Sequence, residues 1–187
     1  KNGESLETIH RIRTIVFDKT GTLTQGKPTV TDIIGHGDFK EEEILRLAAS
    51  AEKGSEHPLG EAIVTAAKEK GVAVRDAEEF EALPGQGIRV KIDGDSYLLG
   101  NMRLMESHHV DIEALKDRME KLAGEGKTPM IVARNQRAAG IVAVADTLKP
   151  NSAEAVQALR RLGLEVIMVT GDNERTARAI AGQIGID

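Results

Sequence analysis

The sequence has 187 residues, 40% of them hydrophobic, so it can bury a core as one large domain or as two small ones. It contains no cysteine, which excludes a disulfide scaffold and a thiolate metal site. A net charge of −5 without a basic stripe argues against nucleic-acid binding, and no apolar run reaches the roughly 18 residues that span a bilayer, so we expect a soluble chain without direct membrane contact.

The first predicted element is a buried strand at residues 13–18, followed by a turn. The run Thr14-Ile15-Val16-Phe17 is β-branched and aromatic, and Gly21 ends it. Asp18 therefore lies at the carboxyl end of a strand, where ligands bind in α/β sheets. A carboxylate there could attack a phosphoryl group. The simpler alternative is that Asp18 only caps a glycine turn.

The middle of the chain favours hairpins and amphipathic helices. Helical apolar spacing predicts helices at 41–53 and 58–71, the second opened by Pro58. Alternating residues around Asp93-Gly94 predict a β-hairpin at 87–100. Beyond it we expect a helix capped by Asp111, and then a strand pair at 129–133 and 139–145.

The pattern changes after Pro150. Asn151 and Glu154 suggest a capping box for a helix that ends at Gly163. Residues 165–169 form a second continuous apolar strand, which ends in the turn Thr170-Gly171-Asp172-Asn173, and a helix to Gly185 follows. The sequence therefore predicts an α/β domain with a parallel sheet, residues 1–28 and 145–187, split by an inserted α+β domain with an antiparallel sheet, residues 29–144.

The string at 18–24, Asp-Lys-Thr-Gly-Thr-Leu-Thr, resembles the phosphorylation signature of the P-type ATPases. The resemblance implies that Asp18 is the nucleophile, assisted by Lys19 and Thr20, and that Asp18 and the Thr20 carbonyl hold Mg²⁺. It also implies that Thr170 binds the transferred phosphoryl group, with Gly171 and Asp172 beside it. Asp146 to Pro150 resembles the hinge segment that returns from the inserted domain.

A second string, Ser55-Glu56-His57-Pro58-Leu59, resembles the signature of the heavy-metal-transporting branch of that family. The resemblance implies that His57 orients ATP and Glu52 contacts adenine. Further matches to the nucleotide site of the family are Gly85, Gly87, Ile88, Gly100 and Asn101. Taken singly, these residues have simpler explanations, since a histidine before a helix is usually a solvated cap and G-x-G is often a turn into a strand.

The resemblance implies a haloacid-dehalogenase-like phosphorylation domain, here incomplete, with an inserted nucleotide-binding domain. The expected function is that of the ATP-binding, autophosphorylating cytoplasmic portion of a heavy-metal P-type ATPase, with Cu(I) export as the first choice by analogy. ATP and Mg²⁺ are the expected cofactors, and the membrane and actuator domains of the parent chain are the expected partners. The family's G-D-G-x-N-D segment and its catalytic lysine follow T-G-D and are not in this sequence, so we expect a fragment with reduced activity.

Two alternatives stay open, a soluble phosphohydrolase of the same fold and a nucleotide-binding regulatory module. Phosphatases with a related aspartate resemble D-x-D, in which the second carboxylate is a general acid and base. Thr20 occupies that position here. We therefore expect slow hydrolysis of the acyl phosphate, which a pump requires and a phosphatase does not.

Overall fold

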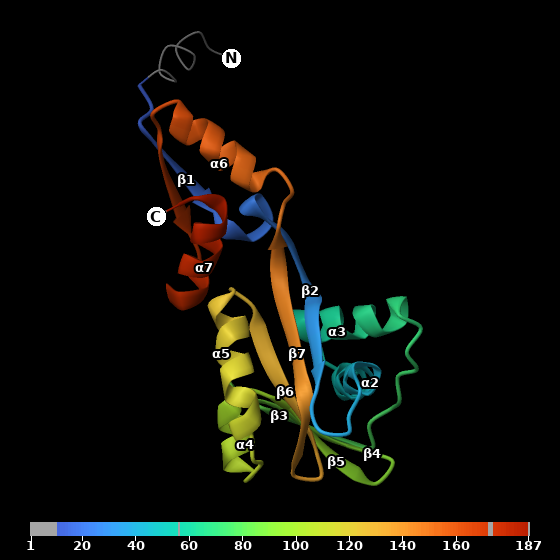
Figure 1. Ribbon diagram of the computed structural model, residues 1–187. Coiled ribbons are helices and arrows are strands. Elements are labelled where there is room, and N and C mark those ends of the chain that lie inside the picture. The colour runs from blue at the N-terminus through green and yellow to red at the C-terminus, as the bar shows by residue number, and fades with distance from the viewer. Residues whose placement is uncertain (1–10, 56, 172–173, 187) are drawn as a thin grey trace. The chain divides into compact units, whose positions relative to one another are not determined.

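The computed structural model describes residues 11–55, 57–171 and 174–186. The chain divides into two compact units: one ends at Gly26 and resumes at Asp146, and the other is Lys27–Ala145. Two long strands, β2 (Thr24–Gly35) and β7 (Arg137–Leu148), run through the two boundaries (Figure 1). None of the described helices is long and apolar enough to cross a bilayer.

The first unit is built on two parallel strands, β1 (Thr14–Asp18) and β8 (Glu165–Val169), and the sequence predicts both strands. The predicted burial of the first strand is wrong, because alternate residues of β1 are exposed and Val16 is 58% exposed. Their register places Asp18 opposite Val169. The helices of this unit are α6 (Ser152–Arg161) and α7 (Glu174–Ile184). Val156 from α6 and Ile184 from α7 are fully buried and pack with Leu23 and Val166, so this cluster fixes the strands against the helices.

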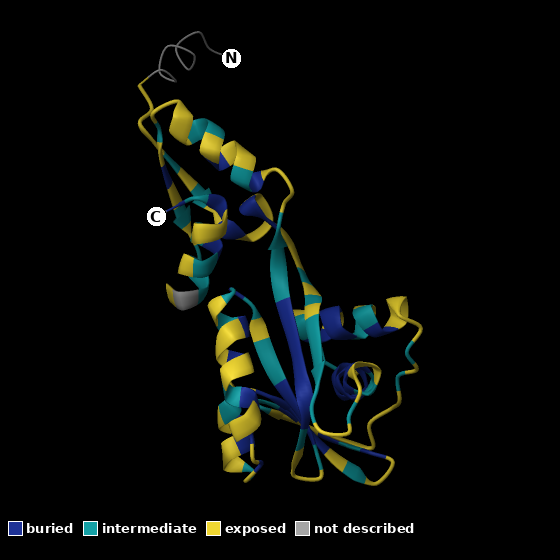
Figure 2. Cartoon of the chain, in the orientation of Figure 1, coloured by how far each residue is buried: buried dark blue, intermediate teal, exposed yellow. Residues whose placement is uncertain are grey.

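The second unit is an antiparallel sheet covered by helices on both faces (Figures 1 and 2). The strand order is β2-β7-β6-β5-β4-β3, with β3 at Glu79–Leu83, β4 at Gly87–Ile92, β5 at Asp95–Gly100 and β6 at Thr128–Arg134. One hydrophobic cluster joins the sheet to α2 (Glu41–Glu52) and α3 (Pro58–Glu69). A second cluster joins it to α4 (Met102–Ser107), a short 3₁₀ turn (Glu113–Leu115) and α5 (Lys116–Gly124).

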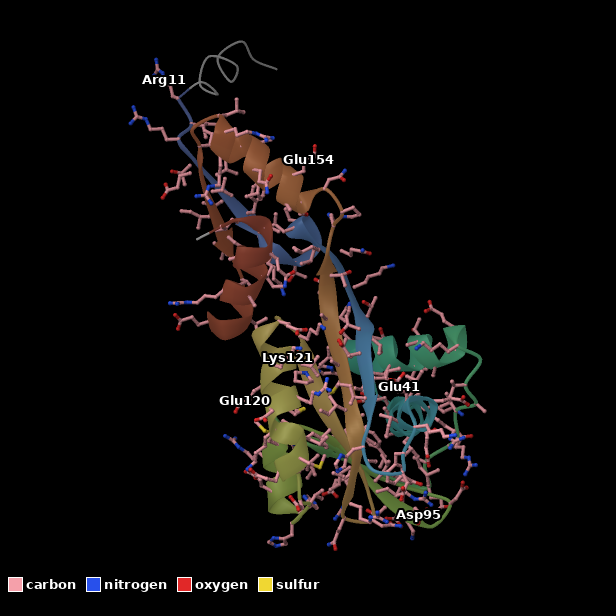
Figure 3. All side chains as sticks on the ribbon, viewed as in Figure 1. Arg11, Glu41, Asp95, Glu120, Lys121 and Glu154 are labelled. Atoms are coloured by element: carbon pink, nitrogen blue, oxygen red, sulfur yellow. The ribbon has the colours of Figure 1, made fainter. Side chains whose placement is uncertain are left out.

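Turn chemistry fixes the register of the hairpins. Asp93 and Gly94 both have positive φ between β4 and β5, and Asn135 and Gln136 do so between β6 and β7. Asp95, labelled in Figure 3, ties the hairpins together by accepting hydrogen bonds from Arg134 Nε at 2.9 Å and Asn135 Nδ2 at 2.6 Å. These bonds hold the pKa of the Asp95 carboxyl below its ordinary value.

The structure corrects the predicted start of α6. The side chain of Asn151 makes no capping hydrogen bond, so the expected capping box is wrong. The backbone at Asn151 (φ −99°, ψ 2°) is not extended, and an N-cap side chain normally acts from an extended residue. Ser152 is anchored instead, because its hydroxyl donates to Leu23 O at 2.6 Å and its N–H donates to Lys149 O at 3.0 Å.

Candidate functional site

Asp18 lies at the carboxyl end of β1 with its side chain exposed. Thr170 and Gly171 follow the neighbouring strand β8, and the parallel register brings both chain segments to the same edge of the sheet. Thr170 is half-buried and Gly171 is exposed, whereas Asp172 lies outside the described residues. The geometry therefore gathers Asp18 and Thr170 at one sheet edge, open to a ligand.

The turn after Asp18 is held by contacts that the sequence analysis did not identify. Gly21 has φ +76°, a conformation that favours glycine. Its N–H donates to Thr24 Oγ1 at 3.3 Å, and its carbonyl accepts from Lys149 Nζ at 2.5 Å. Thr24 is fully buried, and its hydroxyl donates to Asp146 Oδ2 at 2.5 Å. The resemblance marked Asp146 and Lys149 only as hinge residues, because their link to the turn depends on the fold.

The donor atoms near Asp18 suit Mg²⁺. A carboxylate and a backbone carbonyl are hard oxygen ligands, and both Asp18 and Thr20 are exposed. Among the described residues no group of three or more His, Cys, Asp or Glu side chains gathers into a metal cluster. A site with only one or two protein ligands is sufficient for Mg²⁺, because this ion commonly keeps several waters and also binds substrate phosphates.

Glu52 is the last residue of α2, and its side chain is turned into the protein. It is only 7% exposed, and its Oε2 atom is buried without a hydrogen-bond partner in the described structure. Burial raises the pKa of Glu52, although Ser55 and His57 act in the opposite direction. The space for the carboxyl exists because Gly60 has no side chain, since a Cβ there would lie 2.3 Å from Oε2.

His57 combines a structural contact with an accessible ring. Its Nδ1 accepts a hydrogen bond from Leu59 N–H at 3.2 Å, which makes it the N-cap of α3. An accepting Nδ1 places the proton of the neutral ring on Nε2. Because His57 is exposed, that Nε2–H can donate to a ligand. The capping explanation and the binding explanation of this histidine are thus compatible.

The loop Gly85-Gln86-Gly87, which leads into β4, is tightly packed against the end of β5. Gly87 and Gly100 face each other in register, and a Cβ at either position would lie 2.2 Å from a carbonyl oxygen, that of Leu99 or Gln86. These two glycines are therefore explained by the backbone. Gly85 differs, because its φ is +71° and the space beside it is open. A ligand could approach the backbone closely at Gly85.

Asn101 ties this loop to α4. Its Nδ2 donates to Gly85 O at 2.9 Å, and its Oδ1 accepts from Leu104 N–H at 3.1 Å. Ile88 belongs to the hydrophobic core and is 8% exposed. Gly85, Gly87, Gly100 and Asn101 thus form one group, while Glu52 and His57 form another. Both groups border the same hydrophobic cluster, which contains Ala51, Ile63, Ile88 and Leu99.

Comparisons with known proteins agree with this architecture. The model of the haloacid dehalogenase-like hydrolases matches residues 12–187. A copper-exporting P-type ATPase of Bacillus subtilis is 54% identical over 100% of the chain, and one of Staphylococcus saprophyticus is 50% identical over 100%. The chain spans only 23% of the length of each of these relatives.

Solved structures of transport ATPases share the fold. A zinc-transporting PIB-type ATPase in an E2.Pi state has a TM-score of 0.88 and 39% identity, covering 100% of this chain and 30% of that one. The catalytic domain of a CPx-ATPase has a TM-score of 0.63 and 29% identity, covering 100% of this chain and 65% of that one. The expected mixed fold, with a parallel and an antiparallel sheet, is confirmed.

Proposed function

The chain belongs to the haloacid dehalogenase-like hydrolases, and from this premise we propose that it is the ATP-binding and autophosphorylated cytoplasmic portion of a heavy-metal P-type ATPase. The observation that carries the proposal is the position of Asp18, exposed at a sheet edge beside Thr170. The turn that follows is fixed by hydrogen bonds to the N–H and to the carbonyl of Gly21. The two relatives named above as copper-exporting ATPases, similar over the whole chain, support it.

The proposed reaction is phosphoryl transfer to Asp18. A carboxylate oxygen of Asp18 forms a bond to the γ-phosphorus of ATP while the bond to the bridging oxygen breaks, and ADP leaves with that electron pair. Thr170 would hold a phosphoryl oxygen, and the lysine ammonium of Lys19 would balance charge at the turn. Mg²⁺, bound by Asp18 and the Thr20 carbonyl, would neutralise phosphate charge.

The inserted unit would bind the nucleotide. Glu52 would recognise the adenine, His57 would donate its Nε2–H to the nucleotide, and the open backbone at Gly85 would admit the phosphates or ribose closely. Gly87, Ile88 and Gly100 would act by shaping this loop rather than by direct side-chain contact, since they are packed against backbone or core. Asn101 would hold Gly85 in place through its 2.9 Å hydrogen bond.

Cu(I) is the cargo that we propose, and export its direction. The support is that relatives 45–54% identical to this chain are named copper-exporting, whereas the structure named zinc-transporting is 39% identical. The membrane and actuator domains of the longer parent protein would be the partners of this chain. ATPase activity of that parent protein, measured with Cu⁺ and with Zn²⁺, tests the choice, and stimulation by Zn²⁺ alone would contradict it.

Phosphorylation of the full-length parent protein tests the central proposal. We expect acid-stable, hydroxylamine-sensitive incorporation of radiolabelled phosphate from ATP, abolished by Asp18→Asn and retained in Asp38→Asn, an exposed aspartate of the other unit. Labelling that persists in Asp18→Asn would refute the nucleophile. Rapid phosphate release without a labelled intermediate would indicate the phosphohydrolase, and nucleotide binding without labelling would indicate the regulatory module.

A further inference from the structure

One short segment, Asp146–Ser152, holds the whole turn that follows Asp18. Asp146 accepts from Thr24 Oγ1 at 2.5 Å and from Gly26 N–H at 2.9 Å. Lys149 donates its N–H to Leu23 O at 2.9 Å and its Nζ–H to Gly21 O at 2.5 Å. These residues are more than 110 positions apart in the chain but belong to the same compact unit.

The contacts converge on Gly21, the residue of the turn whose backbone is least restricted by its own side chain. A glycine with φ +76° has no Cβ to restrict it, so the orientation of its two flanking peptide planes depends strongly on their hydrogen bonds. In a planar trans peptide the C=O and the N–H point in opposite directions. The Gly21 N–H donates to Thr24 Oγ1, and the carbonyl of Thr20, in the same plane, therefore points away from Thr24.

The second plane is fixed from the other side. The Gly21 carbonyl accepts from Lys149, which sets the orientation of the Gly21–Thr22 peptide. The hydroxyl of Thr24 can accept from Gly21 only while its own proton points to another acceptor. Two acceptors are within reach, Asp146 Oδ2 at 2.5 Å and Lys19 O at 3.1 Å, and the nearer, charged carboxylate is the stronger one. Asp146 thus orients the Thr20–Gly21 plane through Thr24, and Lys149 orients the Gly21–Thr22 plane directly.

We propose that Asp146 and Lys149 are positioning residues for the phosphoryl and Mg²⁺ site at Asp18. Asp146 holds, through Thr24, the peptide plane that carries the Thr20 carbonyl, and Lys149 holds the adjoining plane on the other side of Gly21. The inference rests on the proposed function, in which that carbonyl is an Mg²⁺ ligand. Neither residue takes part in bond making. Removing either should disturb the geometry beside Asp18 and leave unchanged the proposed nucleotide-binding residues of the other unit, Glu52, His57 and Gly85 among them.

Carbonyl labelling reads the Lys149 contact without any reaction. Gly21–Thr22 is the only glycine–threonine dipeptide in the sequence, so ¹³C′-glycine with ¹⁵N-threonine gives a single amide–carbonyl cross-peak. We expect this peak to move in Lys149→Met, because the carbonyl loses a charge-assisted hydrogen bond, and to return toward its position in Lys149→Arg. Lys27→Met, an exposed lysine in the other unit, is the control.

The reverse labelling reads the Asp146 contact. With ¹³C′-threonine and ¹⁵N-glycine the sequence gives two peaks, Thr20–Gly21 and Thr170–Gly171, and Thr20→Ser identifies the first by removing it. Asp146→Asn should move the Thr20–Gly21 peak more than the Thr170–Gly171 peak. If Asp146→Asn fails to fold, Lys149→Met still decides, because that side chain is exposed and its loss leaves the core intact.

Phosphorylation of the full-length parent protein supplies the functional readout. Lys149→Met should slow formation of the phosphorylated protein by roughly tenfold, the equivalent of one lost charge-assisted hydrogen bond, and should raise the Mg²⁺ concentration required. The ATP concentration at half-maximal rate should stay unchanged, and Lys149→Arg should restore the rate. This split between rate and ATP dependence distinguishes positioning from general loss of stability.

The outcomes separate the two proposals. A Gly21–Thr22 peak that stays in place in Lys149→Met overturns the inference, and so does a shifted peak with an unchanged rate and Mg²⁺ dependence. If the wild-type parent protein is not labelled on Asp18, the proposed function fails, and the positioning role falls with it even where the peak moves.

Discussion

Gly60→Ala is the sharpest test of the proposed contact between Glu52 and ATP, because it displaces the Glu52 side chain without changing its chemistry. The substituted Cβ would lie 2.3 Å from Glu52 Oε2, 3.0 Å from its Cδ and 3.2 Å from Ser55 Cβ. Contacts this short require movement, and the atom closest to the new Cβ is the end of a flexible side chain. The carboxyl of Glu52 should therefore rotate out of its buried position while the backbone of α2 and α3 stays in place.

The expected change in stability is small because two effects oppose each other. Displacing the carboxyl gives up packing, but it frees a buried oxygen that lacks a partner, a penalty of about 1–3 kcal/mol. Alanine also favours a helix over glycine by roughly 0.5–1 kcal/mol. We expect the free energy of unfolding to change by less than about 1 kcal/mol, while ATP binding loses about 1–2 kcal/mol, a five- to thirtyfold weaker Kd.

Calorimetry and thermal unfolding on the same samples measure both quantities. A double-mutant cycle with Glu52→Ala identifies the cause: once the carboxyl is absent, Gly60→Ala should have no further effect on ATP affinity. Unchanged affinity in Gly60→Ala alone would show that the Glu52 carboxyl does not contact the nucleotide. A loss of several kcal/mol in stability would show instead that the side chain cannot move and that Gly60 is a purely structural residue.

Three other predictions concern the same unit. Burial raises the pKa of Glu52 above its ordinary value of 4.5, so the stability that the protonated carboxyl contributes is complete below pH 4.5 and is lost as the pH rises through the folded pKa. Glu52→Gln should therefore match the wild type in acid and exceed its free energy of unfolding by about 1 kcal/mol at neutral pH. A difference in unfolding free energy that stays constant across the titration would contradict this prediction. His57→Asn should preserve the cap of α3 and lower ATP affinity, whereas His57→Ala should also cost about 0.5–2 kcal/mol of stability; equal ATP affinity in His57→Asn and wild type would leave only the capping role. The isolated unit Lys27–Ala145 should bind ATP as tightly as the whole chain, because the proposed contacts all lie within it, and calorimetry would show a shared site if binding is lost.

Local patterns predicted the elements whose sequences are unambiguous. The continuous apolar runs of β1 and β8, each ended by a polar turn containing glycine, identified parallel strands and placed Asp18 at a strand end. Asp93-Gly94 likewise identified the β4–β5 hairpin. These signals are local, since a continuous apolar run and a turn residue with positive φ are both encoded within a few positions. The burial of the two strands was not predicted correctly, because Val16 is 58% exposed and Val169 is 53% exposed.

The strands that escaped prediction depend on their neighbours. β2 contains Gly26, Pro28 and Asp32, residues typical of loops, yet it forms a long strand that pairs with β7. β3 is almost wholly exposed, and pairing with β4 together with the 2.6 Å ion pair between Glu81 and Arg89 holds it. Two other features could not be predicted because they join residues that are distant in the sequence. One is the contact between Glu52 and Gly60, which lie on different helices, and the other is the set of hydrogen bonds from Asp146 and Lys149 to the turn at Gly21.

Thr20 connects the geometry of the turn to the fate of the proposed intermediate. A hydroxyl accepts no proton near neutral pH, so the side chain two residues after Asp18 cannot activate a water against the acyl phosphate, whereas a carboxylate there could. The main chain of Thr20 would have an active role, because its carbonyl is the atom proposed to hold Mg²⁺. The hydrogen bond from Gly21 N–H to Thr24 sets the direction of that carbonyl. In the proposed function, position 20 would support formation of the phosphorylated aspartate through its backbone and would slow hydrolysis of that intermediate because its side chain is no base. That combination is what a transport cycle requires, since the energy of the acyl phosphate must last until the protein has changed conformation.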